Sequence, residues 1–197
     1  MKRLIAACLL MVLLCGCAAG NGKPLQGTEP TQTGAGESGG FSGLGGTMPK
    51  MTFYTPNGES MTLSGLLEEK KLVVLNFWFA DCIWCQREFP AMERSYHRYR
   101  EDVEIIALNP VDSADAIRDF QQQYDLSFPM VSCPASWADE MGVRGYPTSI
   151  FIDREGVVCL IHSGAITDAE TFDTLFEKFT ADDYERTVYG SIAQALK

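Results

Sequence analysis

The order of apolar patterns along the chain predicts an α/β protein with a central mixed β-sheet and helices on both of its faces. Two near-continuous apolar runs, residues 72–79 and 103–108, have the composition of strands buried on both sides. Each is followed by apolar residues at helical spacing, over residues 85–99 and 112–124. Because parallel strands need a crossover connection, this alternation indicates a parallel arrangement of the first two strands.

The second half of the pattern adds an antiparallel hairpin and a closing helix. Residues 145–153 give a turn, a proline and a strand, Glu155-Gly156 is a turn signal, and residues 157–163 form the partner strand. A short helix is expected over residues 137–141, and residues 169–180 carry apolar side chains at helical spacing. The expected order is therefore strand–helix–strand–helix–strand–strand–helix.

The first 17 residues have the features of an export signal. Lys2 and Arg3 precede an apolar run over residues 4–14, which is too short to span a bilayer as a helix. Leu14-Cys15-Gly16-Cys17 resembles the bacterial lipobox, which predicts that Cys17 is lipidated and becomes the new N-terminus. An ordinary signal cleaved after a small residue, or an uncleaved anchor, are the alternatives.

Composition divides the rest of the chain into three further parts. Residues 18–47 are rich in Gly, Ser, Thr and Gln, so we expect a flexible tether with a root-mean-square reach of roughly 30 Å. Residues 48–180 form the folded domain, and residues 181–197 are either a further short helix or a loose tail. The lipid anchor and tether predict a domain held at the cell membrane on its extracytoplasmic side.

Charge and cysteine content limit the classes of function. The formal net charge of −10 leaves no electrostatic footprint for nucleic acid. Of the seven cysteines, Cys82, Cys85, Cys133 and Cys159 lie in the predicted domain. Disulfides persist outside the cytoplasm, so redox chemistry is permitted there.

Cys82 and Cys85 stand three apart, directly after the first strand and at the start of the first long helix. A helix N-terminus provides unpaired N–H groups and a partial positive charge, which lower the pKa of a thiol. Residues three apart on a helix share a face, so one cysteine could attack a disulfide and the other resolve the product. A metal clip or a structural staple would use the same spacing, although a three-residue loop stabilises a fold little.

Three motifs give the chain a specific resemblance. They are Asn76 to Cys85, then Glu88-Phe89-Pro90, then Val143 to Asp153 with its Gly-Tyr-Pro-Thr sequence. Over roughly residues 48–180 the chain resembles the membrane-anchored TlpA/ResA-like thiol–disulfide oxidoreductases, which have a thioredoxin-like fold. Two positions depart from related patterns: Ile83-Trp84 lacks the proline common before the second cysteine, and Asn76 stands where thioredoxin has a buried aspartate.

The resemblance implies roles for particular residues. Cys82 and Cys85 would form the redox-active disulfide, with Cys82 as nucleophile and Cys85 as resolving thiol. Glu88, one turn beyond Cys85, would be a partly buried carboxylate with a raised pKa that exchanges a proton with that thiol. The alternative for Glu88 is a solvated position in a polar stretch of the helix.

The resemblance also implies a substrate surface beside the cysteines. Pro147 would be a cis-proline facing the CxxC, and the backbone of Tyr146 would pair with a bound peptide like an added strand. Trp84 would be exposed and contact substrate, whereas Trp78 would lie in the core. Asn76 is expected to be an uncharged strand residue with one local hydrogen bond.

The remaining candidates are interpreted as structural. Cys133 and Cys159 are expected to be small buried apolar residues, with a second disulfide between them as the alternative. His97 is expected on a solvated helix face and His162 as a structural residue of a strand.

The expected function is reduction of disulfides in exported proteins by a monomeric enzyme without cofactor or metal. The family implies apocytochrome c as one substrate and a membrane thiol-electron transporter as reductant. A copper chaperone is the first alternative, but it would use CxxxC and a distal histidine. A thiol peroxidase is the second, but it would need threonine where this chain has Phe79.

Overall fold

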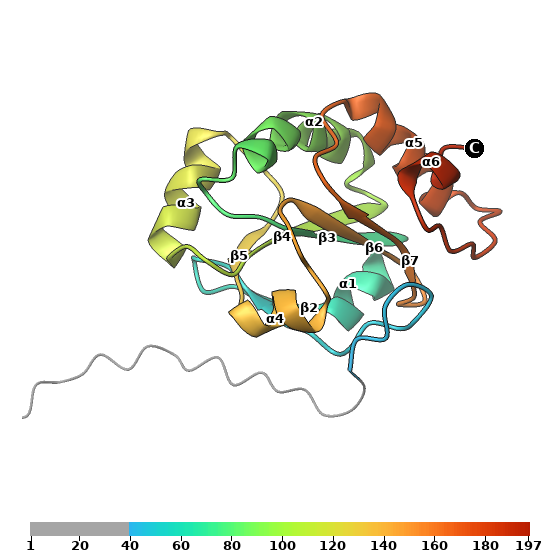
Figure 1. The fold of residues 1–197 in the computed structure, drawn as a ribbon, viewed down its shortest axis with the longest axis horizontal. Coiled ribbons are helices and arrows are strands. Elements are labelled where there is room, and N and C mark those ends of the chain that lie inside the picture. Colours follow the sequence, from blue (N-terminus) through green and yellow to red (C-terminus); the bar gives the residue numbers. More distant parts are fainter. Residues whose placement is uncertain (1–39) are drawn as a thin grey trace, which may run out of the picture. The chain divides into compact units, whose positions relative to one another are not determined.

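The computed structural model describes residues 40–197, and the predicted leader with Cys17 and most of the predicted tether lie outside the described residues. A five-stranded mixed sheet forms the centre of the domain (Figure 1), in the order β5-β4-β3-β6-β7. The strands β3, β4 and β5 are parallel, whereas β6 and β7 pair in antiparallel fashion. The strands are β3 Leu72–Phe77, β4 Val103–Asn109, β5 Met130–Ser132, β6 Thr148–Asp153 and β7 Val158–Ser163.

Helices cover the two faces of this sheet (Figure 1). Buried side chains of α2 Ile83–Tyr99, α3 Ala114–Gln123 and α5 Ala169–Thr180 pack into one apolar cluster. Those of α1 Leu63–Glu69 and α4 Ala135–Glu140 pack into the cluster on the opposite face. The prediction of an α/β fold with both faces covered is confirmed.

The long elements were predicted, but several short ones near the N-terminus and at the edge of the sheet were not. The structure adds β5, the helix α1 and a separate two-stranded hairpin, β1 Thr52–Tyr54 with β2 Ser60–Thr62. Three-residue strands are too short to show alternation, so the sequence carried no periodic signal for them. The strand β5 forms because its backbone pairs with the end of β4.

The central strand β3 leads directly to the CxxC. All six of its residues are buried, and Asn76 lies between Ala107 of β4 and Ser149 of β6. Side chains alternate along a strand, so Val74, Asn76 and Trp78 point to the face covered by α2. A polar side chain is thereby placed under the helix that carries the two cysteines.

Both predicted boundaries of the domain need correction. Gly45 donates a backbone hydrogen bond to Val158, and Val158 donates one to Gly46, so the folded part begins before residue 48. At the other end, the backbone N–H of Tyr189 bonds to the carbonyl of Cys159, and a short helix α6, Ile192–Ala195, follows. The expectation of a short helix in residues 181–197 is confirmed, and that of a loose tail is wrong, because edge strand β7 has free backbone groups that these segments pair with.

An ion pair fastens the C-terminal segment to the sheet. Asp153 at the end of β6 is fully buried, and its Oδ2 accepts from Arg186 Nε at 3.0 Å. We expect Arg186→Ala to lower the free energy of unfolding, because the buried Asp153 carboxylate loses a charged donor. Chemical denaturation measures this, with Arg144→Ala, an exposed arginine 4.0 Å from Asp139, as the control expected within about 0.5 kcal/mol of wild type. Equal stabilities for the two variants would contradict the proposed fastening.

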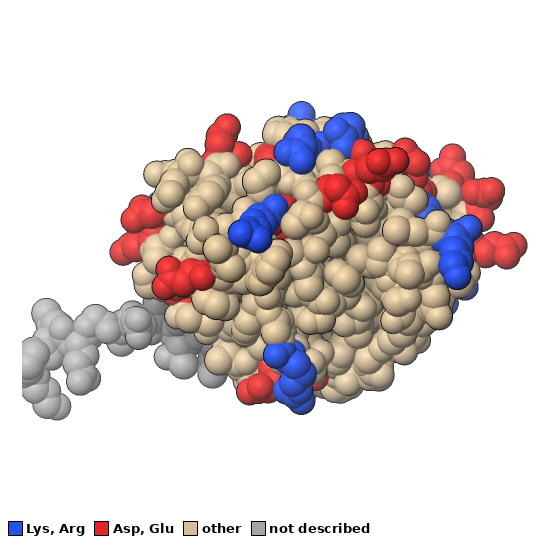
Figure 2. All heavy atoms as spheres, turned by 45° about the horizontal axis from the view of Figure 1, so that its top comes forward, with Lys and Arg blue, Asp and Glu red and all other residues tan. Residues whose placement is uncertain are grey.

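The distribution of surface charge and the length of the helices bear on whether the protein contacts a membrane. In the view of Figure 2, acidic and basic side chains are interspersed with larger uncharged areas. Within residues 40–197, no helix is long and apolar enough to cross a membrane.

Candidate active site

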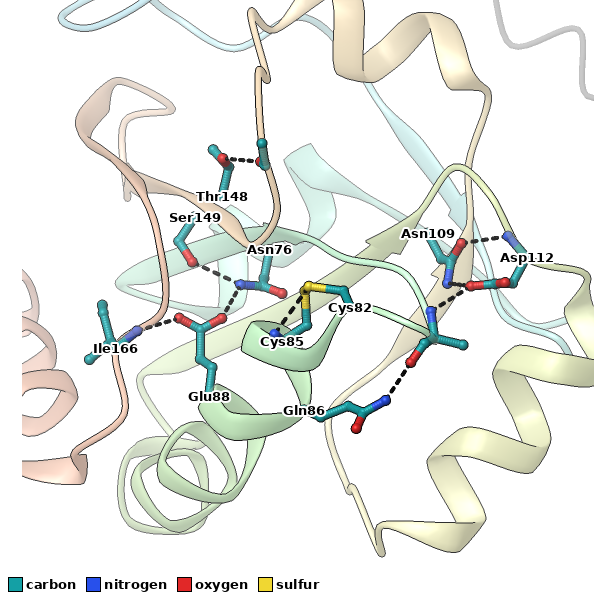
Figure 3. Close-up of a disulfide and its surroundings, with 12 residues drawn as sticks. Asn76, Cys82, Cys85, Gln86, Glu88, Asn109, Asp112, Thr148, Ser149 and Ile166 are labelled. Atoms are coloured by element: carbon teal, nitrogen blue, oxygen red, sulfur yellow. Dashed lines mark hydrogen bonds between the residues drawn. A yellow bond between two sulfur atoms is a disulfide. The ribbon is translucent and has the colours of Figure 1, made fainter.

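The two cysteines of the CxxC form a disulfide at the first turn of α2 (Figure 3). Cys82 is the N-cap residue, and its Sγ accepts a hydrogen bond from the backbone N–H of Cys85 at 3.1 Å. Cys85 is fully buried, whereas Cys82 keeps a 6% exposed fraction. The free N–H groups and the dipole of a helix N-terminus favour a negative charge on the first sulfur. The arrangement therefore suits Cys82 as the attacking thiolate and Cys85 as the inner, resolving thiol.

The loop before Cys82 is anchored by polar side chains that the sequence analysis missed. Asp112, just beyond β4, accepts at Oδ2 from the backbone N–H of Ala80 at 2.7 Å and from Asn109 Nδ2 at 2.8 Å. Gln86 of α2 donates its Nε2 to the carbonyl of Ala80 at 2.7 Å. The missed signal was topological: the carboxyl ends of neighbouring parallel strands meet at one edge of a sheet.

Glu88 lies in the interior one turn beyond Cys85 and is fully buried. Its Oε2 accepts from Asn76 Nδ2 at 2.9 Å and its Oε1 from the backbone N–H of Ile166 at 2.9 Å (Figure 3). Burial raises the pKa of Glu88 to about 7, although the two donors lower it. The solvated alternative for Glu88 is wrong, because α2 packs this side of the helix against the sheet. A carboxyl with this pKa can either bind or release a proton near neutral pH.

Asn76 makes more than the single local hydrogen bond expected of it. Besides Glu88, its Nδ2 donates to Ser149 Oγ at 2.9 Å across the β3–β6 pair. The side chain thus joins the sheet to the buried carboxylate of α2. The sequence could not show this, because the pairing of β3 with β6 joins residues 73 positions apart.

The rim of the site has the expected exposed apolar groups. The peptide bond between Tyr146 and Pro147 is cis, as predicted. The ring of Tyr146 packs edge-on against Phe79, with 5.4 Å between centroids. Trp84 is 53% exposed, with Arg87 stacked over its ring, and Ile83 is exposed beside it. Trp78 is fully buried, so the predictions of an exposed Trp84 and a buried Trp78 are confirmed, and contact of Trp84 with substrate stays a prediction.

The other two cysteines of the domain are free and buried. Cys133 follows β5 and Cys159 belongs to β7, which are the opposite edges of the sheet, and the two side chains pack on opposite faces. The alternative of a second disulfide is therefore wrong, and the expectation of small buried residues is confirmed. Burial raises the pKa of each thiol to about 12, which keeps both protonated and unreactive.

Neither histidine belongs to a candidate metal site in the part of the chain that the structure describes. His97 is exposed and lies 2.9 Å from Glu93 on α2, and burial lowers the pKa of half-buried His162 on β7. Among residues 40–197, no group of three or more His, Cys, Asp or Glu side chains is placed to hold a metal ion.

Comparison with known proteins assigns the chain to a family. The sequence model of the AhpC/TSA family matches residues 44–161, which is more than half of the chain. The chain therefore belongs to the AhpC/TSA family. Solved structures agree on the fold: the thioredoxin domain of a thiol-disulfide oxidoreductase from Bacteroides vulgatus superposes with a TM-score of 0.59 at 21% identity, covering 70% of this chain and 97% of that one.

Relatives define the class within this family. The thiol-disulfide oxidoreductase ResA of Halalkalibacterium halodurans is 41% identical over 113 residues, 56% of this chain and 63% of that protein, so the chain spans less than two thirds of its length. ResA of Bacillus subtilis is 33% identical over 131 residues, 66% of this chain and 72% of that protein. Together with the CxxC at the start of α2, these relatives place the chain among the thiol–disulfide oxidoreductases of thioredoxin fold.

Proposed function

We propose that this chain is a membrane-tethered, extracytoplasmic enzyme that reduces disulfides of exported proteins. The observation that carries the proposal is the cysteine pair in the first turn of α2, with Cys82 as N-cap residue and Cys85 buried behind it. The export signal and lipobox of residues 1–17 support the location. The relatives named thiol-disulfide oxidoreductase support the chemistry.

The proposed reaction follows from the exposure of the two cysteines, because Cys82 is slightly exposed and Cys85 is fully buried. The Cys82 thiolate attacks one sulfur of a substrate disulfide, and the other substrate sulfur leaves as a thiolate that takes up a proton. Cys85 then loses its proton to Glu88 and attacks the Cys82 sulfur of the mixed disulfide. The products are a reduced substrate dithiol and the Cys82–Cys85 disulfide, so two electrons pass from enzyme to substrate.

Substrate binding in this proposal uses the rim of the site. Ile83 and Trp84 offer exposed apolar area next to Cys82, and the Tyr146-Pro147 loop offers backbone for an extended peptide. An unfolded exported protein such as apocytochrome c has the required accessible disulfide. Regeneration of the dithiol needs an electron donor at the membrane, for which a thiol-electron transporter has the matching chemistry.

A peroxidase activity is disfavoured by the position three residues before Cys82. It holds Phe79, whose ring packs on Tyr146. A hydrocarbon ring there offers no hydroxyl to position a peroxide.

The direction of electron flow is tested by the reduction potential. We expect the Cys82–Cys85 pair of the purified chain to have a potential below about −220 mV, close to thioredoxin, because it must give electrons to substrates. Equilibration in dithiothreitol redox buffers, read by alkylation of the free thiols, measures it. A potential near about −120 mV would make the protein an oxidant and overturn the proposed reduction.

A further inference from the structure

One buried polar atom at the site has no hydrogen-bond partner among the described residues. Both hydrogens of Asn76 Nδ2 are used, by Glu88 and by Ser149, but Asn76 Oδ1 is buried and unpaired. Buried acceptors are normally satisfied, since an unpaired one costs free energy. Trp78, Asp173 and Tyr184 each have one such atom as well among the described residues, but Asn76 is the one that is hydrogen-bonded to Glu88.

The unpaired oxygen lies on the side of the cysteines. In Figure 3 the nitrogen of Asn76 points to Glu88 and its oxygen points toward the Cys82–Cys85 disulfide. In the disulfide neither sulfur carries a hydrogen, so nothing on that side can donate from sulfur. Reduction creates a thiol on the inner residue, Cys85, and an S–H group is a donor.

We propose that Asn76 is a positioning residue whose carboxamide links the proton of Cys85 to the proton of Glu88, an inference that rests on the proposed disulfide reduction. While Glu88 is ionised and Cys85 is a thiol, Nδ2 donates to Oε2 of the carboxylate and Oδ1 accepts the S–H. When the proton has moved from Cys85 to Glu88, a half-turn of the carboxamide lets Oδ1 accept from the Oε2–H group and lets Nδ2 donate to the thiolate. One S–H bond is broken and one O–H bond is formed, and no electrons are transferred.

Ser149 fits both orientations of the carboxamide. A hydroxyl can accept from Nδ2, as it does at 2.9 Å, or rotate and donate to Oδ1. Oε1 of Glu88 is occupied by the N–H of Ile166, so Oε2 is the oxygen left to carry the proton. An asparagine combines a donor and an acceptor on one rotating group at every pH, whereas an ionised aspartate only accepts and an apolar residue does neither.

Apart from the cysteines of α2, the groups that pack around Glu88 do not titrate. β3 contributes Asn76, β6 contributes Ser149, and the segment after β7 contributes the backbone of Ile166. On α2 itself the facing ionisable groups are the two cysteines. The pKa of Glu88 is shifted by burial and by its two hydrogen-bond donors, Asn76 and the backbone N–H of Ile166, and by no charged side chain.

The test follows the titrations of the Glu88 carboxyl and of the Cys85 thiol in the full chain with its Cys82–Cys85 disulfide reduced. ¹³C NMR of the Glu88 carboxyl and of the Cys85 Cβ gives the two midpoints in wild type and in Asn76→Leu. We expect both midpoints to rise by about one pH unit in the variant, because each anion loses its amide donor. Turnover with a protein disulfide should fall about tenfold at neutral pH. Asn76→Ser, with a side chain too short to reach Glu88, should behave the same way and serves if the leucine variant does not fold.

The control is Ser95→Ala, which removes a part-buried hydrogen bond from Ser95 Oγ on α2 to the carbonyl of Ala169, away from the cysteines. It should leave both midpoints unchanged. A Cys85 midpoint that stays at the wild-type value in both Asn76 variants would overturn the inference, even if turnover falls. A wild-type chain that cannot reduce protein disulfides, while its two midpoints still shift together in Asn76→Leu, would instead overturn the proposed function alone.

Discussion

Replacing Cys82 by serine is expected to abolish disulfide reduction, with a loss on the order of 10³-fold or more, because the hydroxyl is not ionised near neutral pH and cannot replace the thiolate. Replacing Cys85 by serine should give a different result. Cys82 can still attack, but no thiol resolves the product, so a mixed disulfide with the substrate should accumulate. Non-reducing electrophoresis and mass spectrometry after mixing with a disulfide protein distinguish the two variants.

The matched control for these variants is Cys133→Ala. Cys133 is a buried free cysteine on the face of the sheet opposite to the Cys82–Cys85 pair. Its variant should retain wild-type turnover and lose only a small part of the stability, about 1 kcal/mol for a removed sulfur. Mixed disulfides that form equally with Cys82→Ser and Cys85→Ser would show that Cys82 is not the attacking residue.

The second large effect is expected for Glu88→Gln. The glutamine cannot accept the Cys85 proton, so turnover at neutral pH should fall by about 10²-fold or more. In wild type, the rate of the resolving step should rise as pH increases through about 7, where Glu88 becomes ionised and able to accept a proton. The variant should lack this inflection. Stopped-flow measurement of mixed-disulfide decay at a series of pH values tests both statements.

The same substitution should change how stability depends on pH. The pKa of Glu88 is raised from 4.5 to about 7 by burial, so between these values the folded state keeps a proton that the unfolded chain has lost. The stabilisation is fully present below about pH 4.5 and is lost as pH rises through 7, with an amplitude of about 3 kcal/mol. Urea denaturation of Glu88→Gln should lack this part of the pH dependence, whereas Glu101→Gln, at an exposed position, should keep it. An unchanged pH dependence in Glu88→Gln would show that Glu88 is not the buried group that titrates.

The sequence alone was sufficient for the elements with strong periodicity. Continuous apolar runs are typical of strands buried on both faces, so β3, β4 and β6 could be predicted, and so could the helices α2, α3 and α5. Short elements such as β5 depend on a partner strand, and the sequence does not show which strand that is. The docking of residues 181–197 on β7 depends likewise on tertiary contacts such as the Arg186–Asp153 pair.

The sequence by itself determined the chemistry: two cysteines at a strand-to-helix junction, with a carboxylate one turn farther along. These are local features, and the spacing of residues on one helix fixes which of them share a face. Only the tertiary structure decided what surrounds them. Packing of α2 on β3 buries Glu88 and raises its pKa, and pairing of β3 with β6 brings Ser149 to Asn76. Burial and cross-strand contacts join residues far apart in the chain, so no local pattern could have shown how Asn76 and Glu88 act together.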